Sequence, residues 1–179
     1  MRSVLRGASH NFDPTNTLCN PVECPMPRAT PVTTIVKFRK LKPDATLPKA
    51  MTEGSAGMDL YAYLPDHLIH LEPGAWKLIP CGFAMAMEPG FEAQVRPRSG
   101  MAKKKGVTVL NSPGTIDADY RGQVGVILIN HSGQKVTITH QDRIAQMVIN
   151  ALPRVSVQEV DTLDETERGE GGFGSTGTA

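Results

Sequence analysis

The sequence predicts an all-β domain, a barrel or jelly roll, and three observations support this fold class. From Thr33 onward, short runs rich in valine, isoleucine and threonine recur along the chain. Turns that contain glycine separate these runs. No long segment has the 3.6-residue apolar period of a helix, which argues against a fold of alternating strands and helices.

The expected strands follow one another with turns between them. They cover residues 34–41, 59–63, 76–87, 91–96, 108–110, 123–130, 136–139, 143–149 and 155–160. Glycine stands in the turns at positions 74, 90, 114 and 133, where the backbone can take a positive φ. One helical turn is expected over 101–104, with Ser99 as its N-cap. Many short strands at this spacing are typical of a barrel or jelly roll.

Composition divides the chain of 179 residues into three parts. Residues 1–32 are rich in proline and lack hydrophobic periodicity, which predicts a flexible N-terminal extension. Residues 33–160 contain the expected strands and form the core domain. Residues 161–179 are polar and then glycine-rich, with too few apolar groups to fold alone, so composition by itself predicts disorder there.

The charge and hydropathy of the chain exclude two classes of partner. A formal net charge of +1 leaves no electrostatic footprint for nucleic acid or a membrane surface. The short basic run at Lys103, Lys104 and Lys105 is typical of a solvated turn. No apolar stretch approaches the roughly 20 residues that cross a bilayer, and the N-terminus lacks the apolar run of a secretory signal.

The cysteines indicate a reducing compartment. Cys19, Cys24 and Cys81 are an odd number without a paired framework, so the cytoplasm is expected, with nucleus and organelles left open. Cys19 and Cys24 with His10 form half of a zinc site or, as we favour, two free thiols in the extension, because no second ligand pair follows.

Two segments have residues suited to a hydrated metal ion and to phosphate. Asp59 lies between small residues at a strand start, where its carboxylate holds a hydrated cation or, equally well, caps a turn. In the second segment, Pro97 fixes the chain, Gly100 permits close approach, and Ser99 presents backbone N–H groups at a helix start. Arg98 adds a planar donor fork, so we favour a phosphate site over a plain surface turn.

The densest cluster of polar residues lies in the segment 111–122. Asp117 is placed to act as a general base toward a water molecule. Tyr120 is suited to lie flat against a sugar or a base. Asp119 and Arg121 are expected to form a structural pair within the hairpin rather than to act in catalysis.

A fourth segment and the C-terminal tail complete the candidate site. Gln146 is the polar exception among packing residues, and a buried, satisfied glutamine is the alternative interpretation. In the tail, the segment from Arg168 through Gly177 contains five glycines, which expose backbone donors. Arg168 supplies charge, Phe173 a stacking face, and Ser175 with Thr176 hydroxyl groups. The tail is not a P-loop, because the Gly-Lys-Ser/Thr sequence is absent and no helix follows.

In this order and at these spacings, the five segments resemble the motifs of the trimeric dUTP pyrophosphatase (dUTPase) family. The resemblance runs from about residue 35 to the C-terminus and rests on Ala-Gly-Met-Asp-Leu, Pro-Arg-Ser-Gly-Met-Ala, Gly-Thr-Ile-Asp-Ala-Asp-Tyr-Arg-Gly, Arg-Ile-Ala-Gln-Met and Arg-Gly-Glu-Gly-Gly-Phe-Gly-Ser-Thr-Gly. It implies a distorted jelly-roll subunit in a homotrimer with active sites shared between subunits. The implied reaction is Mg²⁺-assisted hydrolysis of dUTP to dUMP and pyrophosphate, which keeps uracil out of DNA and supplies dUMP for thymidylate synthesis.

The resemblance also implies a role for each motif residue. Asp117 activates the water that attacks the α-phosphate, and Tyr120 packs under the deoxyribose and rejects ribonucleotides. Asp59 supports the hydration shell of Mg²⁺. The hairpin reads the uracil edge, and the other implied contacts bind phosphates or close the tail over the substrate. The implied substrate-binding residues are Arg98, Ser99, Gly100, Asn111, Thr115, Ile116, Tyr120, Gln146, Arg168, Phe173, Gly174, Ser175 and Thr176.

Three positions depart from the family pattern. Gln123 stands where Glu is common, Gly125 where a longer side chain is usual, and Met101 where Leu is typical. None of the three removes a proposed catalytic group, although the first two are expected to affect the hairpin or its contacts with uracil. The alternatives are a dCTP deaminase of the same fold and a trimeric regulatory binding protein; Tyr120 and the complete tail favour the hydrolase.

Overall fold

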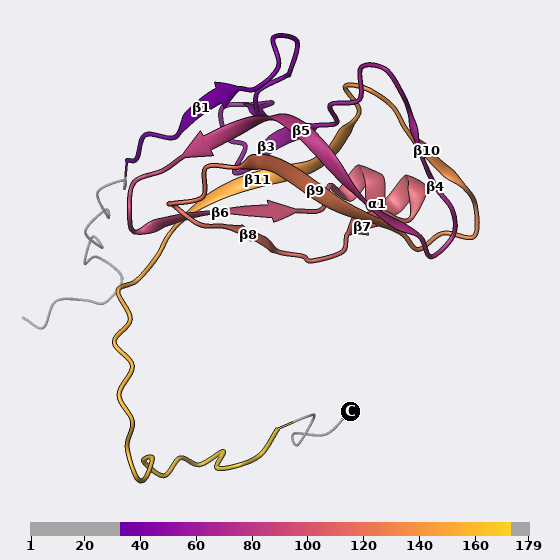
Figure 1. Cartoon of the computed structure of the whole chain (residues 1–179). Coiled ribbons are helices and arrows are strands. Elements are labelled where there is room, and N and C mark those ends of the chain that lie inside the picture. The colour runs from indigo at the N-terminus through magenta and orange to yellow at the C-terminus, as the bar shows by residue number, and fades with distance from the viewer. Residues whose placement is uncertain (1–32, 173–179) are drawn as a thin grey trace, which may run out of the picture. The chain divides into compact units, whose positions relative to one another are not determined.

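The computed structural model describes residues 33–172, which form antiparallel strands and one short helix (Figure 1). In chain order the elements are β1 (Lys37–Lys40), β2 (Lys49–Ala50), β3 (Met58–Tyr61), β4 (Ile69–Leu71), β5 (Trp76–Ala86), β6 (Phe91–Arg96), α1 (Ser99–Lys105), β7 (Val107–Val109), β8 (Gly114–Ile116), β9 (Gln123–Asn130), β10 (Val136–Ile138) and β11 (Arg143–Ala151).

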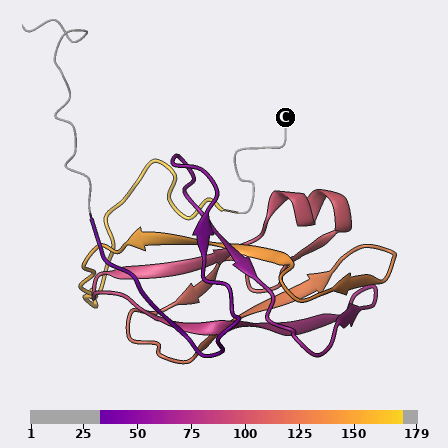
Figure 2. The ribbon, with the colours of Figure 1, turned by 90° about the horizontal axis from the view of Figure 1, so that it is seen from above.

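The strands form two sheets and a ribbon. One sheet has the order β1-β5-β9-β7, the other the order β2-β3-β11-β6-β8, and β10 pairs with β4 alone. Every pairing is antiparallel. Figures 1 and 2 show the helix and the β4–β10 ribbon at the same end of the molecule. The order of the strands in the sheets, with most neighbours distant in sequence, is that of the expected all-β jelly roll.

The core lies between the sheets and is built from alternating strand positions. In β9, every second residue is buried, as expected for a strand with one face toward the core. The middle of β5 is buried on both faces, and its ladder with β9 shifts register between Pro80 and Ala84. Gly82 lies in this irregularity at φ 75°, where a Cβ would stand 2.8 Å from Tyr63 Cγ. The largest fully buried side chains are those of Phe83, Leu60, Leu64, Leu71, Ile79, Leu128, Ile138, Ile144 and Met147.

The sequence predicted most of these elements. The strands expected at 91–96 and 123–130 have the observed bounds of β6 and β9. The helix is present, but Ser99 is its first residue and Arg98 takes the N-cap position without a side-chain hydrogen bond, so the predicted cap was wrong by one residue. Three short strands, β2, β4 and β8, were not predicted, because they contain no valine, unlike the equally short β7 and β10.

The strand predicted at 155–160 is absent. This segment is extended but pairs with no other strand of the described residues, and the side chains of Val155 and Val157 are 79% and 92% exposed. The alternating valines are therefore present without a partner strand. The three-part division at 32 and 160 stays a prediction.

Other expectations concern single groups and surfaces. No helix within residues 33–172 is long and apolar enough to cross a membrane. Cys81 is a free, buried thiol whose pKa is raised by burial to about 12. His10, Cys19 and Cys24, the residues of the possible half zinc site, lie outside the described residues.

Candidate active site

A cavity of about 340 Å³, here called the arginine pocket, brings together the first, second and fourth motifs. It contains Asp59, Arg98, Ser99, Gly100 and Gln146, all of which the sequence analysis placed in the site. The complete lining is Met51, Ser55, Ala56, Gly57, Asp59, Arg98, Ser99, Gly100, Arg143 and Gln146.

The sheet register explains why these residues meet. Gln146 on the central strand β11 lies opposite Asp59 of β3 on one side and opposite Arg96 of β6 on the other. Its side-chain Nε2 donates a 2.9 Å hydrogen bond to the carbonyl of Pro97, which fixes the turn that leads into α1. A Cβ at Gly57 would collide with Gln146 Oε1, so a larger residue at this position would displace the Gln146 side chain.

The Asp59 carboxylate holds two guanidinium groups. Arg98 Nε donates to Asp59 Oδ1 at 2.9 Å, and Arg143 Nη1 donates to Asp59 Oδ2 at 3.2 Å. Arg98 Nη1 also donates to the backbone carbonyl of Arg143 at 3.1 Å. Asp59 is only 8% exposed, so this pairing is screened less than a surface ion pair. The arrangement fixes the direction of the Arg98 side chain.

The same pairing limits how Asp59 can contact a metal ion. Each carboxylate oxygen already accepts one hydrogen bond, and an ionised carboxylate has about four acceptor sites. Capacity therefore remains for water molecules of a hydrated Mg²⁺, whereas direct ligation would place a third cation beside the two guanidinium groups. Among residues 33–172, no group of three or more histidine, cysteine or acidic residues forms a metal site. The described residues of this pocket therefore fit a cation held through water rather than by direct ligation.

A second cavity of about 190 Å³, here called the hairpin pocket, contains the third motif. Asp117 and Tyr120 lie in it with Thr115 and Ile116, and Gln123, Val124 and Gly125 complete the lining. The Tyr120 hydroxyl donates to the backbone carbonyl of Gln123 at 2.9 Å, which fixes the ring over Gly122.

Two residues of the hairpin, Asn111 and Arg121, make contacts that the sequence did not predict. Asn111 does not line the hairpin pocket, and its side chain instead lies beside Gly114 at the turn. The expected pair of Asp119 with Arg121 is not formed: Arg121 Nη1 donates instead to the carbonyls of Ala118 at 2.6 Å and Tyr120 at 2.9 Å. The Arg121 guanidinium thus donates to backbone carbonyls of the tight turn instead of pairing with the Asp119 carboxylate.

Within one chain the two pockets lie at opposite ends of β6. Strand β8 runs antiparallel to β6, with Ile116 opposite Ala93 and Gly114 opposite Val95. Asp117 therefore lies near the start of β6, whereas Arg98 follows its end. At about 3.3 Å per residue, the two side chains are separated by roughly 15 Å or more along the strand.

The tail is only partly described. Arg168 is exposed, and its Nε donates to the carbonyl of Gly171 at 2.7 Å. Phe173, Gly174, Ser175 and Thr176 lie outside the described residues.

Comparison with known proteins decides the family. The dUTPase family model matches residues 43–177. A deoxyuridine 5'-triphosphate nucleotidohydrolase of Syntrophotalea carbinolica is 50% identical over 145 residues, which cover 81% of this chain and 98% of the relative. The enzyme of the same name from Maricaulis maris is 55% identical over 133 residues, 74% of this chain and 88% of the relative. The chain belongs to the dUTPase family.

Solved dUTPase structures share the fold. The Staphylococcus bacteriophage 80alpha dUTPase with dUPNHPP superposes with a TM-score of 0.73 at 24% identity, covering 82% of this chain and all of that chain (100%). A mutant dUTPase from phage phi11 of S. aureus, solved for the coordination of a structural Mg(II) ion, gives a TM-score of 0.66 at 20% identity over 73% of this chain and 99% of that chain. At these identities the likeness shows the fold, a dUTPase jelly roll.

The departures from the dUTPase pattern are tolerated by local structure. Gln123 contacts Tyr120 through its backbone carbonyl, so the contact does not depend on the side chain. A Cβ at Gly125 would stand 2.8 Å from Leu78 Cδ1, so the neighbouring leucine occupies the space of a longer side chain. Met101 is buried in the core as a leucine would be.

Sequence reasoning missed Arg143. Its position in Asp142-Arg-Ile-Ala-Gln beside Gln146 was the available signal. The contact with Asp59 could not be inferred, because it depends on an irregularity in the β3–β11 ladder between Arg143 and Ala145.

Proposed function

We propose that this chain hydrolyses dUTP to dUMP and pyrophosphate. The observation that carries the proposal is the arginine pocket, in which a buried carboxylate and a fixed glutamine direct Arg98 beside Ser99 and Gly100. The names of the close relatives support the substrate.

The arginine pocket is suited to a triphosphate. Arg98 presents a planar guanidinium that carries further N–H donors besides those used within the protein. Gly100 has open space where a Cβ would stand, so a ligand can approach the backbone closely. Because Asp59 fixes the guanidinium before the substrate arrives, little reorganisation is needed on binding.

Mg²⁺ fits this pocket in an outer-sphere arrangement. When bound, Mg²⁺ would neutralise part of the negative charge of the phosphates. Asp59 would hold it through hydration water, using the acceptor capacity that the two arginines leave.

The hairpin pocket is suited to the nucleoside and to the attacking water. Asp117 takes a proton from water, the water oxygen attacks the α-phosphorus, and the bond to the α–β bridging oxygen breaks, releasing pyrophosphate. Tyr120, 44% exposed and fixed by its hydrogen bond to Gln123, offers its ring to the deoxyribose and leaves no space for a 2′-hydroxyl. Thr115 and Ile116 offer backbone groups to the uracil edge, with Asn111 at the base of the turn.

The separation of the pockets supports a site shared between copies of the chain. A general base acts within hydrogen-bond reach of its water, about 3 Å, whereas Asp117 and Arg98 of one chain lie at opposite ends of β6. In a homotrimer, Asp117 of one subunit can face Arg98 of another, so the distance between the two residues within one chain no longer matters.

An exposed apolar face supports the same assembly. On the outer side of the β5–β9 pair, Trp76 lies opposite Ile129 and Leu78 opposite Ile127. Trp76 and Leu78 are 59% and 62% exposed, and exposed apolar patches of this kind mark protein interfaces.

The tail acts as a lid in this proposal. Arg168, Ser175 and Thr176 grip the γ-phosphate, while Phe173 stacks over uracil beside Gly174. Closure excludes bulk water from the reacting phosphate.

A substrate panel tests the function. Pyrophosphate release is measured with dUTP, dTTP, dCTP and UTP in the presence of Mg²⁺, and a strong preference for dUTP is expected. Release of ammonia from dCTP would instead identify a deaminase. Binding of dUTP without turnover would identify a regulatory nucleotide-binding protein. The reaction needs no membrane or nucleic acid, and the cytoplasm is the compartment we propose.

A further inference from the structure

Met51 is the one exposed sulfur side chain among residues 33–172, and it lines the arginine pocket. It is 53% exposed, so it lies at the opening of that cavity. Met58, on β3, is half-buried. The remaining methionines of this part of the chain are buried: Met85, Met87, Met101 and Met147.

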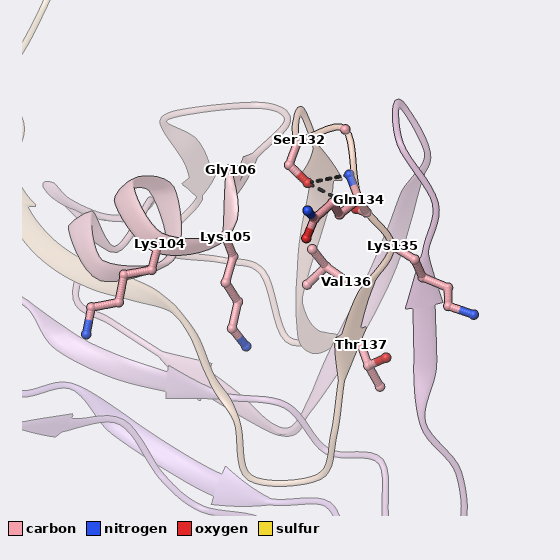
Figure 3. A pocket seen from close by; sticks show the side chains of 9 residues that line it. Lys104, Lys105, Gly106, Ser132, Gln134, Lys135, Val136 and Thr137 are labelled. Carbon is pink, nitrogen blue, oxygen red and sulfur yellow. Dashed lines mark hydrogen bonds between the residues drawn. The ribbon is translucent and has the colours of Figure 1, made fainter.

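Cys81, the cysteine of the described residues, is protected from oxidation. It is 1% exposed, and burial raises the pKa of its thiol to about 12, so the thiolate that reacts with peroxides is almost absent at neutral pH. The cavity of about 670 Å³ between the end of α1 and the β9–β10 turn has no sulfur in its lining, and its lysine side chains extend in different directions (Figure 3). A peroxide that reaches residues 33–172 therefore meets the sulfur of Met51 first.

The backbone on both sides of Met51 is held in place. Ala50, the preceding residue, pairs with Met58 in the β2–β3 ladder. In the turn that follows, the backbone N–H of Thr52 donates to Ser55 Oγ at 3.1 Å, and the backbone N–H of Ser55 donates to the carbonyl of Thr52 at 3.1 Å. The two hydroxyl groups also share a 2.7 Å hydrogen bond. A chemical change in the Met51 side chain therefore stays at the pocket.

Oxidation would change the hydrogen-bonding character of this side chain. A thioether sulfur is a weak acceptor, whereas a sulfoxide is polar and carries an oxygen that accepts hydrogen bonds. Arg98 and Arg143 line the same pocket, and each keeps N–H donors beyond those that it uses within the protein. A sulfoxide oxygen at position 51 competes with phosphate oxygens for these donors.

We propose that Met51 is a redox-sensitive modification site, where oxidation by a peroxide to the sulfoxide weakens triphosphate binding in the arginine pocket. This inference rests on the proposed function of that pocket. The Met51 sulfur attacks one oxygen of hydrogen peroxide, the O–O bond breaks, that oxygen stays on sulfur, and the other leaves as water. Sulfur is oxidised by two electrons and the peroxide is reduced by two. A methionine sulfoxide reductase with a thiol reductant reverses the change.

Peroxide treatment of the full chain tests the proposal. Calorimetry measures the Kd of a non-hydrolysable imido analogue of dUTP before and after treatment, and mass spectrometry follows each methionine. We expect the sulfoxide to form faster at Met51 than at Met58, and Kd to rise by about tenfold, the effect of one charge-assisted hydrogen bond. Treatment with the reductase should restore Kd as the Met51 sulfoxide disappears from the mass spectrum.

Two leucine variants assign the effect to one side chain. Leucine is close to methionine in volume and has no sulfur. The Kd of Met51→Leu should be the same after peroxide treatment as before it. Met58→Leu is the matched control, and its Kd should rise on treatment as that of the unmodified chain does.

The outcomes separate this inference from the proposed function. Faster oxidation at Met58, an unchanged Kd with Met51 fully oxidised, or an equal rise of Kd in Met51→Leu overturns the role of Met51. Hydrolysis of dUTP is measured on the untreated chain. A chain that binds the analogue without hydrolysing dUTP counts against the proposed function alone, whereas a chain that does not bind the analogue counts against both.

Discussion

Arg143 and Arg98 both donate to the Asp59 carboxylate, so removal of the Arg143 side chain should act through Asp59 and Arg98. In Arg143→Gln, Asp59 Oδ2 loses its 3.2 Å guanidinium partner, so the carboxylate that holds Arg98 is fixed by one ion pair instead of two, while the hydrogen bond from Arg98 to the backbone carbonyl at position 143 is kept. We expect KM for dUTP to rise by about tenfold, the effect of one charge-assisted hydrogen bond. Steady-state kinetics with the Arg39→Gln variant as control checks this, because Arg39 is an exposed arginine outside both substrate pockets. An unchanged KM would remove Arg143 from the positioning of Arg98.

The sequence predicted which residues lie together where they belong to one short motif. Arg98, Ser99 and Gly100 are adjacent in sequence and line the arginine pocket together. Two of the failures, the expected pairing of Arg121 with Asp119 and the missed contact of Arg143 with Asp59, concern long side chains. A guanidinium reaches several acceptors, and only the folded backbone decides which one it meets.

The loop before β2 is attached to the barrel by a hydrogen bond that depends on pH. Tyr63 donates through its hydroxyl to Asp44 Oδ1 at 2.8 Å. This bond holds the pKa of Asp44 below its ordinary 3.8 and the pKa of Tyr63 above its ordinary 10.0. The lowered pKa means that the contribution of Asp44 is present above about pH 4 and is lost as the pH falls. The raised pKa means that the contribution of Tyr63 is lost as the pH rises beyond about 10.

Tyr63→Phe should therefore lower Tm most between these limits. The difference in Tm from the unmodified chain should narrow in acid and in alkali, and thermal denaturation across pH measures it. Tyr61→Phe serves as the control. Tyr61 is the last residue of β3, two residues before Tyr63, and no hydrogen bond from its hydroxyl is present in the described structure. A difference that does not vary with pH would show that the hydrogen bond from Tyr63 to Asp44 does not carry the effect, because phenylalanine keeps the ring that packs edge-to-face with His140.

At the scale of elements, a deletion tests the lid role that we propose for the C-terminal tail. Deletion of residues 168–179 removes Arg168 and Phe173 but none of the strands β1 to β11. We expect kcat/KM for dUTP to fall by about a hundredfold or more, since preorganised donors to the phosphates are lost. Tm should change little. Full activity in the truncated chain would refute the lid.

The segment 155–160 shows why an element can be visible in sequence and absent from the chain. Its alternating valines have the period of a strand, yet no strand of residues 33–172 pairs with it. A strand needs a partner backbone, and periodicity gives no information about whether that partner belongs to the same chain. The short β8, which positions the hairpin pocket, is the converse case, because β6 supplies its partner and its own sequence gives no strand signal.

At the scale of the whole molecule, mixing two inactive variants tests whether the site is shared. Asp117→Asn removes the proposed base, and Arg98→Ala removes the proposed phosphate contact, so each homotrimer should lose about a hundredfold or more in turnover. Unfolded together and refolded at equal concentrations, the variants form mixed trimers. If Asp117 and Arg98 of one site come from different subunits, about a quarter of the sites carry both native residues and activity returns to about that fraction.

The mixture distinguishes a shared site from a site within one chain, because no single chain in it contains both groups. Pyrophosphate release is measured before and after refolding, with each variant refolded alone as the control. Activity that stays at the level of the separate variants would place Asp117 and Arg98 in the same subunit's site. That result would require the roughly 15 Å between the ends of β6 to close within one chain. The antiparallel pairing of β6 with β8 opposes such a movement, since it would break the ladder that positions the hairpin.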